Sequence, residues 1–153
     1  MITRVFEAPI QLVYDAWTQP DHVAKWMKCD ADATLEVEGW EPRVGATFQT
    51  RMAKGDQLIA LSTGTIVEAD PPHVFSYATD PAPELGVPVM TVRIELREVE
   101  GGTELTLTHS GVPDERICGF LEGGWGVSLE LLKDLVVALA GTYAKNENTG
   151  GSE

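Results

Sequence analysis

The spacing of apolar and polar residues changes twice along this chain, which divides it into an N-terminal segment, a strand-rich middle and a C-terminal helix. Residues 2–7 read as a strand and lead into Pro9, whose fixed φ suits the first turn of a helix. Apolar residues as far as Trp17 then recur at helical spacing. Thr18 is the expected N-cap of a second short helix, which ends near Trp26.

The middle of the chain predicts six strands. Five stretches alternate apolar and polar residues, which is typical of strands with one buried and one solvent-facing side. The sixth, residues 57–68, is a longer apolar run whose facing the pattern leaves open. Turn residues separate the stretches, as at Lys54-Gly55-Asp56, and favour antiparallel hairpins. The other five strands are expected at residues 34–38, 47–52, 74–77, 90–97 and 104–109.

The C-terminal third returns to helical spacing. An apolar stripe predicts a helix from about residue 124 to residue 143. A sheet with one apolar face needs a cover, and this helix carries the matching stripe. We therefore predict an α+β fold in which a curved antiparallel sheet wraps around the C-terminal helix. The stripe consists of Trp125, Leu129, Leu132, Val136, Leu139 and Tyr143, widened by Leu131, Leu135 and Ala138.

Composition narrows the class of protein. The 153 residues suit a single domain, expected at residues 1–143 and followed by a flexible polar tail at 144–153. A net charge of −13 argues against nucleic acids and anionic membranes as partners. No apolar run is long enough for membrane insertion, and no signal pattern opens the chain. We expect a cytoplasmic protein in which Cys29 and Cys118 stay reduced.

An ordered set of short motifs resembles a known family. The chain is similar to the helix-grip superfamily of START lipid-transfer domains, birch-pollen-allergen-like proteins and polyketide cyclases (SRPBCC). Within that superfamily it most resembles the branch named after the homologue of the heat-shock-chaperone ATPase activator. The resemblance implies the element order β-α-α-β6-α. It rests on residues 4–9, Val13, residues 17–18, Pro20, Trp26, residues 44–45, Phe48, residues 64–68, residues 71–72, Phe75, residues 102–108, residues 124–125, Leu129 and Leu132.

Two positions depart from that family's pattern. Ala46 stands where members usually carry a second glycine, and Met27 stands where they often carry a second aromatic residue after Trp26. These departures bear on the ligand more than on the fold. Eukaryotic chaperone activators also have an additional N-terminal domain, whereas this sequence begins at the first strand, so a cochaperone role is poorly supported.

The superfamily implies a cavity between the sheet and the long helix. Strand phase and helix phase then predict the side chains that line it, and methionine and aromatic walls suit an adaptable apolar pocket. The alternative is that these side chains simply fill the core. The predicted lining is Phe48, Thr50, Met52, Tyr77, Met90, Val92 and His109 from the sheet, with Trp26, Leu121, Trp125 and Leu129 from the helices.

His109 is the candidate for chemistry. It is in phase with Leu105 and Leu107, so its imidazole is expected to face inward and to have a lowered pKa. The alternative is a strand-end histidine satisfied by a backbone group or water. Arg4 is in phase with Phe6 and is either a cavity cation or a side chain that reaches solvent. Thr50 is the polar residue on the apolar face of its strand.

Three functions fit these features. The first is binding of a hydrophobic or aromatic small molecule without chemistry. The second is a cofactor-free cyclase or dehydratase that uses His109 as acid and base. The third is an interaction protein that activates a chaperone ATPase. We expect no metal and no cofactor, because the histidines and cysteines share no ligand spacing. Whether the chain forms a homodimer is left open.

Overall fold

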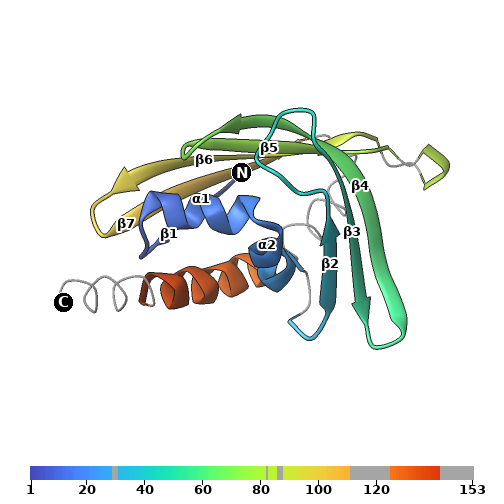
Figure 1. Cartoon of the computed structure of the whole chain (residues 1–153), viewed down its shortest axis with the longest axis horizontal. Coiled ribbons are helices and arrows are strands. Elements are labelled where there is room, and N and C mark those ends of the chain that lie inside the picture. The colour runs from blue at the N-terminus through green and yellow to red at the C-terminus, as the bar shows by residue number, and fades with distance from the viewer. Residues whose placement is uncertain (29–30, 82, 86–87, 111–124, 142–153) are drawn as a thin grey trace.

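The structure of the protein is a computed structural model. It describes residues 1–28, 31–81, 83–85, 88–110 and 125–141, which are coloured in Figure 1. The predictions for Cys29, Cys118, Leu121, Tyr143 and the tail lie outside these residues.

A curved antiparallel sheet forms the upper layer of the molecule (Figure 1). The described residues contribute seven strands to it, in the order β1-β7-β6-β5-β4-β3-β2. Each consecutive pair from β2 to β7 is a neighbouring pair, and β1 joins the opposite edge by pairing with β7. All the predicted strands are present. They are β1 (Ile2–Phe6), β2 (Thr34–Glu38), β3 (Thr47–Lys54), β4 (Gln57–Asp70), β5 (Val74–Thr79), β6 (Met90–Val99) and β7 (Gly102–Ser110).

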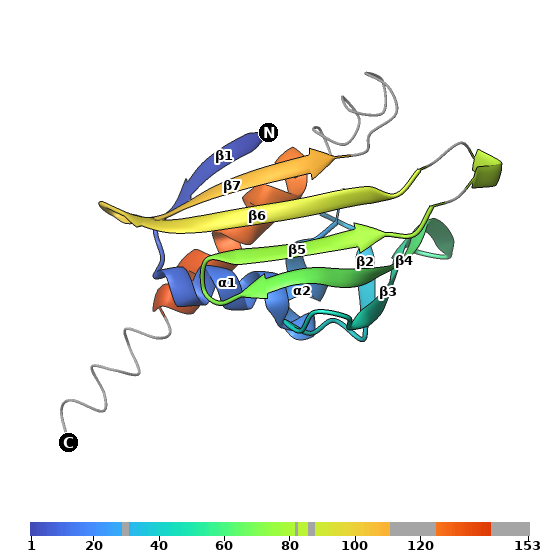
Figure 2. The same cartoon turned by 90° about the horizontal axis from the view of Figure 1, so that it is seen from above.

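The helices lie against the concave side of the sheet, as Figures 1 and 2 show from two directions. They are α1 (Ile10–Thr18), α2 (Pro20–Trp26) and a C-terminal helix over residues 125–141. A short 3-10 turn, η1 (Pro83–Leu85), lies between β5 and β6. The arrangement is the α+β fold expected from the pattern and the helix-grip architecture that the resemblance implies. Within the described residues, no helix is both long enough and apolar enough to cross a membrane.

The prediction that Thr18 caps α2 was wrong. The N-cap is Gln19, and it makes no side-chain capping hydrogen bond. The Thr18 hydroxyl instead donates to the Tyr14 carbonyl oxygen, 2.9 Å away, one turn back in α1. Pro20 begins α2, and its fixed φ provides the restart that the sequence pattern assigned to a threonine cap.

The hydrophobic core lies between the sheet and the helices. The stripe of the C-terminal helix faces it, with Leu129, Leu132 and Val136 buried. Ala138, expected to widen that stripe, is exposed. A fully buried Leu or Val contributes roughly 1.5–3 kcal/mol relative to an exposed one, so this face holds the helix on the sheet.

The alternation of buried and exposed side chains along strand β4 is irregular. Its register shifts between Ile66 and Glu68, and that of the β3–β4 pair shifts between Met52 and Ala53. Ile66 is fully buried, while Leu61 is 55% exposed. Each bulge reverses the alternation of side chains, which is why the sequence pattern could not assign a facing to this strand.

Charged side chains lie on the outer face and at the edges of the sheet. Arg93 on β6 forms an ion pair with Glu68, 2.9 Å away, and a second with Glu95. Arg4 lies on the edge strand β1, exposed, and donates to the Thr3 carbonyl oxygen at 3.0 Å. Of the two alternatives for Arg4, the structure therefore favours the side chain that reaches solvent.

Candidate functional site

An aromatic cluster covers the inner face of the sheet near its centre. Tyr77 of β5 lies with its ring centroid 5.5 Å from that of Phe48 and 5.0 Å from that of Trp40. Trp40 also lies 4.7 Å from Phe48 and 5.9 Å from Phe75. These rings are all buried, so the interior is apolar and aromatic, as predicted for Phe48 and Tyr77.

Trp40 was not among the predicted site residues. It lies in the connection between β2 and β3, where the sequence has no regular spacing from which a facing could be inferred. The structure shows that this connection folds inward, because the Trp40 indole N–H donates to the Trp17 carbonyl oxygen at 2.8 Å. The signal available in the sequence was the residue type alone, since a tryptophan in a loop is most often partly buried.

Three neighbouring strands place Tyr77, Val92 and His109 in one row. Tyr77 pairs with Val92 across β5 and β6, and Val92 pairs with His109 across β6 and β7. Paired residues on antiparallel strands share a face, so all three side chains are on the inner side. Tyr77 and Val92 are buried and His109 is half-buried. The inward phase predicted for His109 is the phase found.

His109 is tied to the C-terminal helix. The indole Nε1–H of Trp125, at the start of the described helix, donates to His109 Nδ1 at 3.2 Å. The two ring centroids are 6.2 Å apart in an edge arrangement. Because Nδ1 accepts this hydrogen bond, the neutral ring carries its proton on Nε2. Burial lowers the pKa of His109, which favours that neutral form.

The first two helices complete the surroundings of the row. The Trp17 ring stacks on Trp125 with centroids 5.9 Å apart, and its centroid is 4.5 Å from that of Trp26. Directly after Trp26, the Met27 sulfur accepts a hydrogen bond from the Tyr77 hydroxyl at 3.8 Å. Met27 is the residue at which the chain departs from the family pattern.

The links between these residues form a closed cycle made of hydrogen bonds, ring contacts, strand pairing and, between Trp26 and Met27, the chain itself. From Tyr77 they run through Met27 and Trp26 to Trp17 and Trp125, then through His109 and Val92 back to Tyr77. We refer to these seven residues as the interior ring. It links β5, β6 and β7 with α1, α2 and the C-terminal helix. Of the predicted lining, it contains Trp26, Tyr77, Val92, His109 and Trp125.

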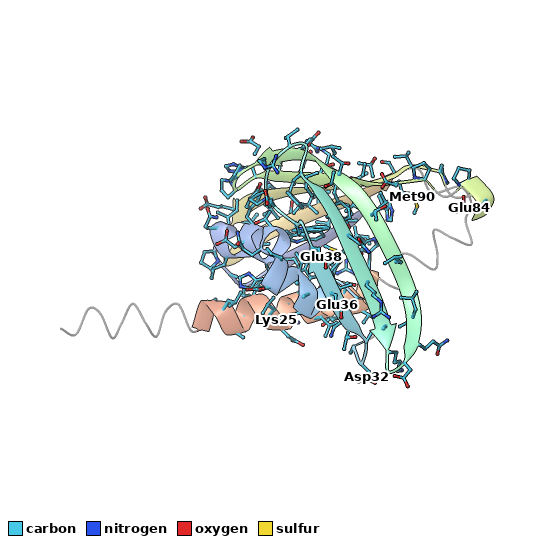
Figure 3. The ribbon with its side chains drawn as sticks, turned by 45° about the vertical axis from the view of Figure 1, so that its right-hand side comes forward. Lys25, Asp32, Glu36, Glu38, Glu84 and Met90 are labelled. Atoms are coloured by element: carbon cyan, nitrogen blue, oxygen red, sulfur yellow. The ribbon has the colours of Figure 1, made fainter. Side chains whose placement is uncertain are left out.

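The other predicted residues that the structure describes lie outside the interior ring. Phe48 contacts it through Tyr77, and Leu129 is buried in the adjoining core. Thr50 and Met52 are half-buried farther along β3. Figure 3 shows Met90 at the far end of the sheet near Glu84, away from the helices. In that view Glu36 and Glu38 project from β2, the edge strand, and both are exposed.

The four tryptophans of the chain differ in one respect. The indole N–H groups of Trp26, Trp40 and Trp125 donate to Ala16 O at 2.7 Å, Trp17 O at 2.8 Å and His109 Nδ1 at 3.2 Å. Trp17 is fully buried, yet its indole N–H has no hydrogen-bond partner in the structure. A buried donor without a partner lowers the stability of a fold by about 1–3 kcal/mol. The Trp17 indole N–H is such an unsatisfied donor in the interior of the protein.

Tyr14 carries a second buried polar atom without a partner, its hydroxyl oxygen. Burial, aided by the charges of Asp70 and Asp15, raises the pKa of Tyr14 to about 12. Its ring lies edge-on to Phe75 with centroids 6.3 Å apart. Tyr14 belongs to the core but makes no ring contact with the interior ring.

An open groove of about 430 Å³ lies elsewhere on the molecule. It is lined by residues 7–11 at the start of α1 and by Glu98, Gly101 and Gly102 near the β6–β7 turn. It shares no residue with the interior ring. Among the described residues, no three His, Cys, Asp or Glu side chains come together as ligands of a metal ion.

Comparison with known proteins gives one family. The model of the family described as "Activator of Hsp90 ATPase homolog 1-like protein" matches residues 7–137. A search of curated proteins finds no match.

Solved structures with the same fold come from several bacteria. A protein from Chromobacterium violaceum is 25% identical, with 88% of this chain and 94% of that chain covered and a TM-score of 0.77. An AHSA1-like protein from Aeromonas hydrophila is 24% identical, with coverages of 90% and 91% and a TM-score of 0.75. The structure described as an Aha1 dimer from Colwellia psychrerythraea is 20% identical, with coverages of 88% and 92% and a TM-score of 0.71.

Proposed function

Since this chain belongs to the family of activator of Hsp90 ATPase homolog 1-like proteins, we propose that it binds an apolar or aromatic small molecule between the sheet and the C-terminal helix. One observation carries the proposal. The indole N–H of Trp17 is buried among aromatic rings and has no partner.

A bound ligand could supply the hydrogen-bond acceptor that this indole N–H lacks. Ligand sites in proteins are mostly apolar, with a few polar groups that fix the ligand's orientation. The interior ring has that composition, because Trp17, Trp26, Trp125, Val92 and Met27 supply apolar surface. Met27 adds a flexible, polarisable side chain that can adjust to a ligand's shape.

The second candidate, a cyclase or dehydratase, receives less support from the geometry of His109. A general base needs a nitrogen lone pair free to accept the substrate's proton. The Nδ1 lone pair already accepts the Trp125 N–H, so the other nitrogen, Nε2, is the protonated one. His109 is therefore arranged as a hydrogen-bond donor toward a ligand.

Two further aspects follow from relatives. The family is named after a chaperone activator, and this name is the main support for a cochaperone role. The Colwellia protein is described as a dimer. We propose that this chain acts in the cytoplasm, either as a monomer or as a similar dimer. Light scattering at two protein concentrations distinguishes these two oligomeric states.

The binding proposal is tested with a neutral environment-sensitive dye, N-phenyl-1-naphthylamine, whose fluorescence rises in apolar surroundings. Val92→Phe adds bulk inside the interior ring, so we expect the dye to bind at least several-fold more weakly. Val137→Phe is the matched control, because Val137 is 45% exposed on the C-terminal helix. Equal dye binding by wild type and Val92→Phe, with both folded by circular dichroism, would exclude this site.

A further inference from the structure

Three side chains of the interior ring, Trp17, Tyr77 and His109, have a donor hydrogen that no protein oxygen accepts among the hydrogen bonds described above. Resting on the proposed function, we infer that the ligand is an uncharged molecule with an accepting oxygen, a carbonyl or an ether, toward which Trp17, Tyr77 and His109 present their hydrogens. The inference concerns the polarity of the ligand, which the family relationship leaves unspecified.

Trp17 provides the first donor. An indole N–H can donate and cannot accept, so only an acceptor can satisfy it. The ring is fully buried, and the structure gives its Nε1 no partner. The carbonyl oxygens of Ala16 and Trp17 already accept the indoles of Trp26 and Trp40. A carbonyl oxygen can accept two hydrogen bonds, but neither of these oxygens is a partner of the Trp17 N–H, so the missing acceptor has to come from another group.

Tyr77 provides the second donor. Its hydroxyl contacts the Met27 sulfur at 3.8 Å, and a thioether is a weak acceptor. Burial raises the pKa of Tyr77, so the hydroxyl keeps its proton at every physiological pH. An oxygen acceptor on a ligand would replace a weak hydrogen bond with an ordinary one.

His109 provides the third donor. With Nδ1 accepting from Trp125, the ring presents Nε2–H as its remaining polar group. The row Tyr77, Val92 and His109 places two of the three donors on the same face, separated by one strand. A flat molecule lying over Val92 would have a donor near each side.

No cation accompanies these donors among the described residues. The described arginines lie at the edges, in the connections or on the outer face of the sheet, where Arg93 pairs with Glu68 and Arg97 with Glu104. Lys28 donates to the Ala33 carbonyl oxygen at 2.8 Å. A carboxylate ligand would lose its hydration without gaining a counter-charge from the described residues, in a protein whose net charge is already −13.

Three molecules of one shape test the inference. Fluorene, 9-fluorenone and fluorene-9-carboxylate share a tricyclic skeleton and differ in having no acceptor, a carbonyl oxygen and a charged carboxylate. We expect fluorenone to displace N-phenyl-1-naphthylamine at a concentration roughly 2- to 10-fold below that of fluorene, as one added hydrogen bond predicts. The carboxylate should be the weakest of the three.

Two variants test which donors cause the preference for fluorenone over fluorene. Tyr77→Phe and Trp17→Phe each remove a donor and keep an aromatic ring, so each should reduce the preference for fluorenone over fluorene. Tyr14→Phe is the matched control, because it removes a buried hydroxyl outside the interior ring and should leave the preference unchanged. Circular dichroism checks that each variant is folded.

The outcomes separate the two proposals. If fluorene and fluorenone compete equally, or if the carboxylate binds best, the inference is overturned while the binding proposal stands. If neither the dye nor any of the three molecules binds the wild-type protein, the binding proposal itself fails. If Tyr14→Phe changes the preference as much as Tyr77→Phe does, the donors act elsewhere and the inference is again overturned.

Discussion

At the scale of single residues, one hydrogen bond links the protonation of His109 to the packing of Trp125. The indole N–H of Trp125 donates to Nδ1 and therefore requires that nitrogen to be unprotonated. Protonation would turn Nδ1 into a donor and leave the indole N–H without its acceptor. The largely buried Trp125 ring has little access to water as a substitute.

This coupling predicts a pH dependence of stability. Burial lowers the pKa of His109 in the folded protein below its ordinary value of 6.5, so the unfolded chain takes up the proton first as the pH falls. The free energy of unfolding should therefore decrease from about pH 7 downward and level off below the folded pKa. Burial is the cause of this shift.

Chemical denaturation between pH 5.5 and 7.5 measures this dependence, above the range in which most carboxylates titrate. His109→Gln keeps a polar side chain that cannot titrate there. We expect the wild type to lose stability relative to His109→Gln as the pH falls. Parallel curves for the two proteins would show that protonation of His109 is not linked to folding.

At the scale of elements, the C-terminal helix is held by a narrow set of buried side chains. Leu132 is fully buried at the middle of its stripe. We predict that Leu132→Ala lowers the free energy of unfolding by ~2–5 kcal/mol, because it removes apolar contacts and leaves a cavity. Val137→Ala, on the exposed side of the same helix, should change it by less than ~0.5 kcal/mol. An unchanged denaturation midpoint for Leu132→Ala would contradict this packing.

The lack of a side chain at Gly64 lets strand β4 pack closely against Phe48 of strand β3. Gly64 faces Phe48 across β3 and β4, and a Cβ atom at Gly64 would overlap the Ala78 carbonyl oxygen and lie 2.6 Å from the Phe48 ring. Gly64→Ala should therefore cost about 1–3 kcal/mol through overpacking. Gly126→Ala, in the C-terminal helix with open space around it, should be neutral or stabilising. Thermal unfolding of both variants makes the comparison, and equal melting temperatures would refute the clash.

Regular strands were predictable from sequence, and irregular segments were not. Strand β7 runs without a bulge, so the spacing from Leu105 to His109 correctly gave the face of the histidine. Strand β4 has two register shifts, and its alternation cannot be followed through them. Trp40 lies in a connection without any period, and its role depends on tertiary contacts that no local pattern encodes.

In the interior ring, too, residues in regular elements were predictable from the sequence, whereas tertiary hydrogen bonding was not. The sequence predicted that Tyr77, Val92, His109 and Trp125 face the interior, because each belongs to a strand or helix with clear spacing. It did not predict which donor would lack an acceptor. That property of Trp17 depends on the exact positions of neighbouring carbonyl oxygens, two of which are used by Trp26 and Trp40.

At the scale of the whole molecule, the two faces of the sheet carry different kinds of side chain. The inner face holds aromatic rings and few polar atoms, whereas the outer face carries ion pairs such as Arg97 with Glu104 at 2.7 Å. Exposed pairs of this kind contribute little to stability, in general about 0–1 kcal/mol each. The net charge of −13, which such pairs leave unbalanced, adds repulsion between copies of the protein.

The pairing of β1 with β7 has a consequence for synthesis on the ribosome. Ile2 pairs with Leu107, about 105 positions later in the chain, and Thr103 closes the same seam by donating to the Ala8 carbonyl oxygen at 2.8 Å. At roughly 5–20 residues per second, the first strand waits about 5–20 s for its partner to be made. During that interval the nascent chain displays an unpaired strand next to apolar side chains. Strand β1 thus emerges long before β7 and can pair with it only after β7 has been made.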